Sequence, residues 1–314
     1  ETENVDALTD VVNAAVQLAI QSLVREKKKV VLFPGGTARL TNEDCSPDTS
    51  VTWMWDTYSQ VAGAVKPLAK PGSKWFFLAA DYAFGHSLQK DGAEIIQAQG
   101  AEVVGAVRHP FSTSDFSSFL LQAQNSPANF IAFANAGSDS TTSIRQAAEF
   151  GVQSSGKKTV ALFLTLHNVK SLGLQAAAGT QLTESFYWNA DEGTRRWSAR
   201  YSAAVGNGGK PSISHAGVYS ATRHYLKSVV AARSKDAKVV TAKMREIPIK
   251  DDIVRNASLR PDGRMVHDTY LLEVKKPNQS TSDWDLYNVL QVIPGSQVFR
   301  PITESSCPAL KKTG

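Results

Sequence analysis

The chain has 314 residues, a length that accommodates two domains of ordinary size. Hydrophobic residues make up 42% and charged residues 20%, which is typical of globular proteins and excludes a disordered polar chain. No apolar run approaches the ~20 residues that span a membrane as a helix. The net charge of +5 comes from small, scattered basic groups without interleaved aromatic residues, so we expect no nucleic-acid partner.

The first seventy residues predict a helix, a buried strand and a second helix. Asn13 is a suitable N-cap for a helix over 14–26, and the apolar run 29–33 predicts a buried strand. An irregular loop is predicted over 42–52. A helix is predicted over 53–69, where it ends before a Pro-Gly pair that favours a change of domain.

Three strand–helix units follow in a row. The predicted strands lie at 75–81, 103–107 and 129–135, and the predicted helices at 87–99, 116–121 and 144–150. Continuous apolar strands that alternate with amphipathic helices predict a parallel sheet covered on both faces. Such sheets bind ligands at the carboxyl ends of their strands, so the loops 81–85 and 135–139 are candidate binding loops.

The remaining third of the chain predicts further strands and helices, followed by a small β section. The predicted strands lie at 159–164, 185–188, 269–274 and 288–294, and the predicted helices start at 191, 215 and 238. Residues 260–264 form a predicted turn between two extended segments. This pattern adds a β section to a doubly wound α/β protein.

The chain contains two cysteines, Cys45 and Cys307, in polar loops that each contain a proline. Neither belongs to a Cys-x-x-Cys or histidine-paired pattern, so we expect no metal site. In an oxidising compartment an even count favours a disulfide, which would tie the C-terminal tail to the first domain. Two unrelated thiols are the alternative.

Six sequence segments, spread along nearly the whole chain, carry a resemblance to a known family. They are WFFLAADYAFGHSLQKDGAEIIQAQGAEVVGAVRHPFSTSDFSSFLLQAQ, FANAG, QAAEFGV, HAGVYSA, DGRMVHDTYLLEVKKP and ITESSCPALKK. In these motifs the chain resembles the bacterial periplasmic substrate-binding proteins of ABC transporters, in the branched-chain amino acid (Leu/Ile/Val-binding) family.

The resemblance implies a two-lobed type I periplasmic-binding-protein fold, in which each lobe is a doubly wound, mostly parallel α/β sheet flanked by helices. We expect lobe 1 over 1–71 and 191–267 and lobe 2 over 72–190. Residues 268–314 are expected to give lobe 2 strands and the C-terminal tail. About two βα units of the family's first lobe precede the position that Glu1 matches, and we expect the natural protein to contain them.

The resemblance also assigns ligand recognition in lobe 1. Gly35, Gly36 and Thr37 match the loop that holds the ligand's α-carboxylate with main-chain N–H groups and a hydroxyl. Asn13 matches a second segment at a helix start, which suits an anion, but Ala14 follows it where relatives often carry a hydroxyl donor. An ordinary turn and a plain N-cap are the alternatives for these two segments.

In lobe 2, Tyr82 and Phe84 match the loop whose aromatic ring closes over the ligand. One of these rings is expected at the site and the other in the lobe core. The remaining ligand-binding candidates follow later strands or begin the long helix near the expected hinge: Asn135, Ala136, Gly137, Thr165 and Tyr219.

Leu166 and His167 stand where amino-acid binders of the family carry an acidic residue for the ligand's ammonium group. Without that carboxylate, we rank aromatic carboxylates above branched-chain amino acids, with amides and urea third. A carboxylate from another loop would undo this ranking.

The expected function is capture of a small organic solute, an aromatic carboxylate or a branched-chain or hydrophobic amino acid, between two lobes. The solute is then delivered to ABC permease subunits. We expect a non-enzymatic monomer without cofactor, in the periplasm, secreted through a signal peptide that is removed. A ligand-sensing domain of the same fold for amides or amino acids is the main alternative. An α/β enzyme is a second, although the sequence shows no nucleophile–base set.

Overall fold

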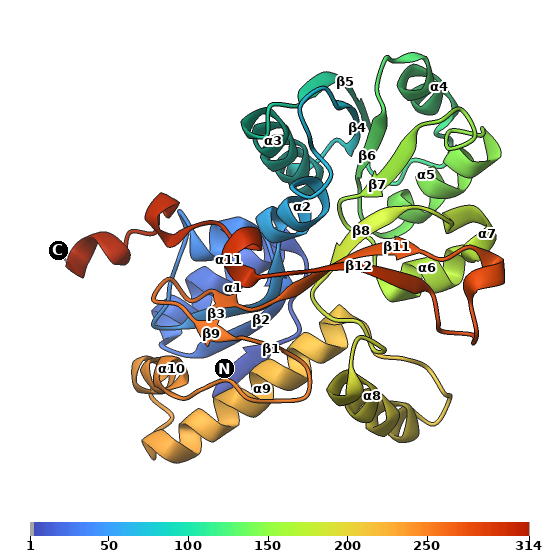
Figure 1. The fold of residues 1–314 in the computed structure, drawn as a ribbon. Helices are drawn as coiled ribbons and strands as arrows, with labels where there is room; N and C mark the ends of the chain where they lie inside the picture. Colours follow the sequence, from blue (N-terminus) through green and yellow to red (C-terminus); the bar gives the residue numbers. More distant parts are fainter. Residues whose placement is uncertain (1–2, 314) are drawn as a thin grey trace. The chain divides into compact units, whose positions relative to one another are not determined.

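The computed structural model describes residues 3–313 (Figure 1). The backbone forms two compact units. Unit 1 comprises Trp188–Asp268 together with the described parts of 1–56 and 294–314, and unit 2 comprises Thr57–Tyr187 and Thr269–Ile293. The chain therefore passes from one unit to the other four times.

These units differ most from the expected lobes at two places, and the boundary expected after residue 190 lies after Tyr187. The expected first boundary lay after residue 71, whereas unit 2 already begins at Thr57, because helix α2 (Thr57–Val65) packs on helix α3 (Ala83–Ala98). The sequence predicts lobe 2 strands and the C-terminal tail together over residues 268–314. The structure assigns Thr269–Ile293 to unit 2 and the segment from Pro294 to unit 1.

In its described residues, unit 1 contains three parallel strands, a short two-stranded pair and four helices of ten or more residues. Its elements are β1 (Ala7–Thr9), α1 (Ala14–Lys27), β2 (Val30–Gly36), η1 (Ala38–Thr41), β3 (Ser50–Asp56), α8 (Glu192–Val205), α9 (Ile213–Ala232), α10 (Ala237–Glu246), β9 (Ser258–Leu259), β10 (Met265–Val266), α11 (Gly295–Val298), η3 (Ile302–Glu304) and η4 (Leu310–Thr313). Strands β1, β2 and β3 pair in that order as a parallel sheet.

Apolar packing sets the arrangement of unit 1. Val24 of α1 forms one buried cluster with Val31, Phe33 and Leu40. On α9, Gly217 lies so close to the sheet that an added Cβ would stand 2.8 Å from Met54, so only glycine allows this approach. The long α9, drawn in yellow in Figure 1, therefore lies directly on the sheet.

The prediction of a helix over 53–69 was wrong in its first part. Ser50–Asp56 is strand β3, and only Thr57–Val65 is helical. Every residue of β3 is buried, as is usual for a parallel strand covered on both faces, so the strand lacks the alternation that distinguishes it from a buried helix.

The outer edge of β3 is met by side chains instead of a further long strand. The Arg264 guanidinium donates to the carbonyl oxygens of Trp53 (3.1 Å) and Trp55 (2.9 Å). Nε2 of His267 lies 2.8 Å from the carbonyl oxygen of Met54. Burial lowers the pKa of His267 to about 4 and that of Arg264 to about 10, so at neutral pH the imidazole is neutral and the guanidinium charged. Three successive strand carbonyls are thereby hydrogen-bonded by side chains.

Unit 2 is an α/β layer structure. Its elements are α2, β4 (Lys74–Ala80), α3, β5 (Glu102–His109), α4 (Ser117–Asn125), β6 (Phe130–Ala134), α5 (Gly137–Glu149), β7 (Lys158–Ala161), α6 (Leu166–Leu172), α7 (Leu174–Ala177), β8 (Gln181–Glu184), β11 (Thr269–Val274), η2 (Pro277–Gln279) and β12 (Tyr287–Ile293). The sheet order is β12-β11-β8-β7-β6-β4-β5.

The paired strands from β4 to β8 are parallel, and β11 and β12 join antiparallel at one side. Helices α2 and α3 cover one face of this sheet, and α4, α5 and α6 cover the other (Figure 1). The predicted mostly parallel, doubly wound α/β fold is therefore confirmed. The predicted strand at 185–188 was wrong, because strand β8 ends at Glu184 and the aromatic run after it leads out of unit 2.

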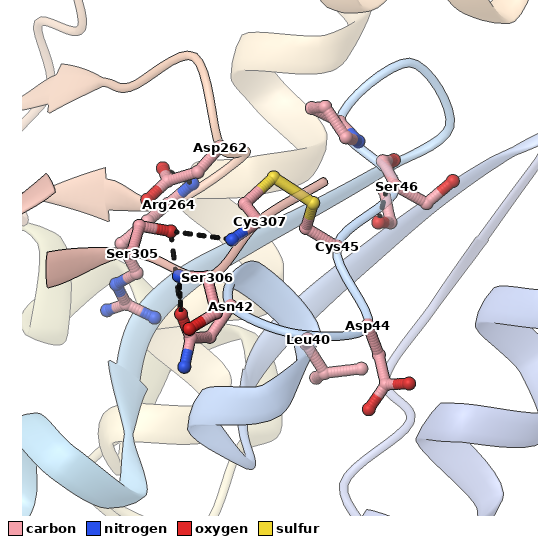
Figure 2. The surroundings of a disulfide bond; sticks show 12 residues. Leu40, Asn42, Asp44, Cys45, Ser46, Asp262, Arg264, Ser305, Ser306 and Cys307 are labelled. Atoms are coloured by element: carbon pink, nitrogen blue, oxygen red, sulfur yellow. Dashed lines mark hydrogen bonds between the residues drawn. A yellow bond between two sulfur atoms is a disulfide. The ribbon is translucent and has the colours of Figure 1, made fainter. Parts of the chain in front are cut away.

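The C-terminal tail is joined covalently to unit 1, as predicted. Cys45 and Cys307 form a disulfide with their Cα atoms 5.4 Å apart (Figure 2). Beside it, the Asn42 side chain accepts a hydrogen bond of 2.6 Å from the main-chain N–H of Ser306. Within residues 3–313, no helix is both long and apolar enough to cross a membrane.

Candidate ligand-binding site

The unit 1 candidates gather at the carboxyl ends of β1 and β2. Asn13 follows β1, whereas Gly35 and Gly36 end β2 and Thr37 follows them. Because β1 and β2 are parallel neighbours, both loops lie at the same edge of the sheet. The structure therefore brings together the two segments expected to bind a carboxylate.

Gln17 holds these two loops together, a role that the sequence did not reveal. Its buried Nε2 donates to the carbonyl oxygens of Val11 (2.8 Å) and Gly35 (2.6 Å). Its Oε1 accepts the N–H of Thr37 at 3.3 Å. A Cβ at Gly36 would stand 2.3 Å from that oxygen, so glycine is needed for this contact.

The side chains of Asn13 and Thr37 both act as caps. Asn13 Oδ1 accepts from the N–H groups of Ala15 (3.1 Å) and Val16 (3.2 Å), which confirms the predicted N-cap. Thr37 Oγ1 accepts from the N–H of Arg39 at 3.4 Å. A threonine hydroxyl that accepts one hydrogen bond still has its proton to donate, so Thr37 keeps the capacity to bind an anion.

In unit 2, four aromatic rings gather at the carboxyl ends of β4, β5 and β7. The ring of Tyr82 lies 5.1 Å from that of Phe111 and 6.2 Å from that of Phe84, measured between centroids. Phe84 also contacts Phe163, at 5.5 Å. Phe84 is buried and Tyr82 half-buried, in line with the expectation that one ring packs in the core. Phe111, which the sequence did not reveal, is 65% exposed.

Asp139, in the first turn of α5, lies beside these rings. It is 1% exposed, and its Oδ2 accepts the N–H of Ser112 at 3.1 Å. Its Oδ1 is buried and has no hydrogen-bond partner among residues 3–313. An unsatisfied buried acceptor costs about 1–3 kcal/mol, and more when it is charged. Burial, and secondly the charge of Asp139, raise the pKa of Tyr82.

The three candidates after β6 have mixed surroundings. Asn135 is fully buried, and its Oδ1 lies 2.9 Å from Nε2 of His109 while its Nδ2 donates to Ser143 at 3.1 Å. Its side chain thus links the loop after β6 to the end of β5 and to helix α5. Ala136 is half-buried, and the exposed Gly137 begins α5 with φ +58°, a conformation that favours glycine.

Thr165 and Tyr219 are placed differently. Thr165 caps α6 in a reciprocal pair with Asn168. Tyr219 lies in a groove of about 1210 Å³ between α8 and α9 of unit 1, where its hydroxyl accepts from Arg200 at 3.3 Å. Thr165 lies outside the loops after β4 and β6, which contain the other candidates of unit 2. Tyr219 lies outside the loops after β1 and β2, which contain the other candidates of unit 1. Among the described residues, no group of three or more His, Cys, Asp or Glu side chains is arranged to hold a metal ion.

Unit 2 also contains a second buried carboxyl group, at the carboxyl end of β8. Glu184, at the end of β8, accepts the N–H of Leu166 at 3.1 Å. Burial raises its pKa well above the ordinary glutamate value, and the hydrogen bond from Leu166 offsets only part of this. This carboxyl is therefore a structural group that stays protonated beyond the usual pH range.

Comparison with known proteins gives a consistent picture. A family model described as periplasmic binding protein matches residues 1–280. A periplasmic binding protein from Burkholderia mallei is 41% identical with a TM-score of 0.90, and the match covers 98% of this chain and 82% of that one. A branched-chain amino acid ABC transporter periplasmic ligand-binding protein from Burkholderia xenovorans is 38% identical, with a TM-score of 0.91 and the same coverage.

A more distant structure shares the fold alone. It is an ABC transporter solute-binding protein from Rhodopseudomonas palustris in complex with benzoate, 17% identical with a TM-score of 0.82 over 98% of this chain and 82% of that one. A comparison with curated protein sequences gave no match. The family model covers most of the chain, and the first two structures exceed 30% identity. The chain therefore belongs to the periplasmic binding protein family.

Proposed function

We propose that this protein captures a small organic acid in the periplasm, after removal of a signal peptide, and delivers it to the permease subunits of an ABC transporter. The solute is an aromatic carboxylate or a hydrophobic amino acid. Family membership supports this role, and so do the relatives that bind branched-chain amino acids or benzoate.

The observation that carries the proposal is the loop pair fixed by Gln17 at the carboxyl ends of β1 and β2. Gln17 holds both loops in place through its own hydrogen bonds. A preorganised site of this kind loses less entropy when the solute binds. The Thr37 hydroxyl then donates to the solute carboxylate. Binding and release need no covalent step, so the solute leaves unchanged.

The experiment is calorimetric titration of the purified protein with benzoate, leucine and related acids, followed by mass spectrometry of the recovered compound. Thr37→Val removes the hydroxyl at nearly constant volume and should weaken binding by roughly ten-fold. Thr303→Val, an exposed threonine in the tail of the same unit, serves as the matched control and should bind as the parent does.

Equal affinity of the parent and the Thr37→Val variant would remove Thr37 from the site. Chemical conversion of a bound compound would contradict a transport role and point to an enzyme.

A further inference from the structure

The carboxyl ends of the unit 2 strands hold the candidate Tyr82 together with two residues that have no assigned role, the aromatic Phe111 and the buried acceptor Asp139. Tyr82 follows β4, Phe111 follows β5 and Asp139 follows β6. These three strands are neighbours in the order β6-β4-β5 and run parallel, so their following loops share one edge of the sheet.

The loop that carries Phe111 is held in an uncommon conformation. Ser112 has φ +62°, in the left-handed region that residues with a side chain rarely adopt. The N–H of Ser112 donates to Asp139 Oδ2, and the Thr113 hydroxyl donates to the carbonyl oxygen of Pro110 at 2.6 Å. Asp139 thereby fixes the loop that exposes the Phe111 ring beside Tyr82.

One carboxylate oxygen is used in this way and the other is not. Asp139 Oδ1 is covered and has no hydrogen-bond partner in the described part of the chain. Buried polar atoms in proteins are nearly always satisfied. Among the buried side-chain atoms of residues 3–313 that have no partner, Asp139 Oδ1 is the one carboxylate oxygen, for which a missing hydrogen bond costs most. Its place at this edge of the sheet points to a donor that comes from outside the chain. Because Oδ1 is covered, a neighbouring side chain must move before a donor can reach it.

We propose that Asp139 is a specificity-determining residue that accepts a hydrogen bond from a donor group on the solute, while Tyr82 and Phe111 pack against its apolar body. This inference rests on the proposed function and narrows it. The solute is an organic acid with a second, hydrogen-bond-donating group, either the ammonium of an amino acid or the hydroxyl of a phenolic acid. Acids without such a donor leave Asp139 Oδ1 unsatisfied and bind more weakly.

This reverses part of the ranking drawn from the sequence. The sequence ranks aromatic carboxylates as a class above branched-chain amino acids, because Leu166 and His167 stand where relatives carry an acidic residue. Asp139 supplies a carboxylate from a different loop, so a hydrophobic amino acid or a hydroxylated aromatic acid fits unit 2 better than benzoate does.

Matched pairs of acids test the proposal on the parent protein without any substitution. The pairs are leucine with isocaproate, phenylalanine with hydrocinnamate, and para-hydroxybenzoate with benzoate, each measured by titration calorimetry. The member that carries the donor should bind about ten- to a hundred-fold more tightly in at least one pair. A preference within the first two pairs identifies an ammonium group, and one within the third pair identifies a hydroxyl.

Asp139→Asn tests the residue itself. Asparagine keeps an oxygen for the Ser112 N–H but loses the charge, so the preference within the pair should shrink by about ten-fold or more. Affinity for the donor-free acid should not fall. Asp115→Asn, which alters an exposed aspartate of the same unit, is the matched control and should keep the preference. Melting temperatures without ligand show whether each variant is folded.

Equal affinities within all three pairs would overturn the inference and leave the proposed function standing. An unchanged preference in a folded Asp139→Asn variant would also overturn it. If none of the acids binds the parent protein, both the proposed function and the inference fail.

Discussion

Units 1 and 2 use the same alternation of strands and helices and both have apolar cores, but they differ in the width of their sheets and in the side-chain hydrogen bonds that join their segments. Unit 2 has a broad sheet with fully buried aromatic residues such as Trp75, Phe77 and Phe133. Unit 1 has a narrow sheet, and side-chain hydrogen bonds from Gln17, Arg264 and His267 join its segments. A smaller sheet buries less apolar surface, so polar and covalent links carry a larger share of its stability.

The largest expected effect comes from Arg264→Met. This change leaves Asp56 without the guanidinium that lies 3.5 Å from its carboxylate, and it removes the donors to two carbonyl oxygens of β3. Removing one partner of a buried charge pair costs about 3–5 kcal/mol. Urea unfolding should show this loss, and hydrogen exchange should place it in unit 1.

Arg39→Met is the matched control, because Arg39 forms exposed ion pairs in the same unit and should cost less than about 1 kcal/mol. If the two variants lose equal stability, the contrast between the units does not depend on Arg264.

The second effect comes from the disulfide. Replacing Cys45 and Cys307 together by serine opens a link between residues 262 positions apart, for an expected loss of about 2–4 kcal/mol. Amide exchange should speed up most in the tail from Pro294 onward and leave unit 2 unchanged. Mass spectrometry of the unreduced parent provides the reference, and two free thiols in that sample would contradict the bond.

The smallest expected effect concerns unit 2 and the pH dependence of its stability. The pKa of Glu184 is raised in the folded protein, so the folded state holds a proton that the unfolded state releases above its ordinary pKa of about 4.5. This contribution to stability is therefore fully present at low pH and is lost as pH rises toward the folded pKa.

Glu184→Gln cannot ionise, so its stability relative to the parent should rise with pH above about 5. Thermal unfolding from pH 4 to pH 8 measures this gain. Glu94→Gln, on the surface of the same unit, should show no such trend. If the difference in melting temperature between Glu184→Gln and the parent stays constant across the pH range, the raised pKa of Glu184 is refuted.

Much of unit 2 was predictable from sequence because its strands are continuous apolar runs between clear helices. The elements around Trp75 and Phe130 follow the predictions closely. Strand β3 was not predictable, because Trp53, Met54 and Trp55 are buried without alternation and a run of this kind suits a helix equally well.

The residues of the candidate site also form two groups, those that the sequence suggested and those that it did not. Gly35, Gly36, Thr37 and Tyr82 are candidates that the sequence offers, because they stand at the ends of predicted strands, where a ligand is expected. Gln17, Phe111 and Asp139 have roles that depend on contacts with residues far along the chain, and no local pattern encodes these contacts. The only sequence signal for Asp139 was its place in the predicted loop 135–139.

The contacts of Arg264 and His267 with β3 have a consequence for solubility. An exposed strand edge offers unpaired carbonyl oxygens on which another chain can add a strand and begin aggregation. Here the oxygens of Trp53, Met54 and Trp55 are already occupied, two of them by a charged group that a growing β-stack would have to displace. The N–H of Thr52 also donates to the carbonyl oxygen of Gly263 at 2.9 Å, so side chains and backbone together close this edge to strand addition.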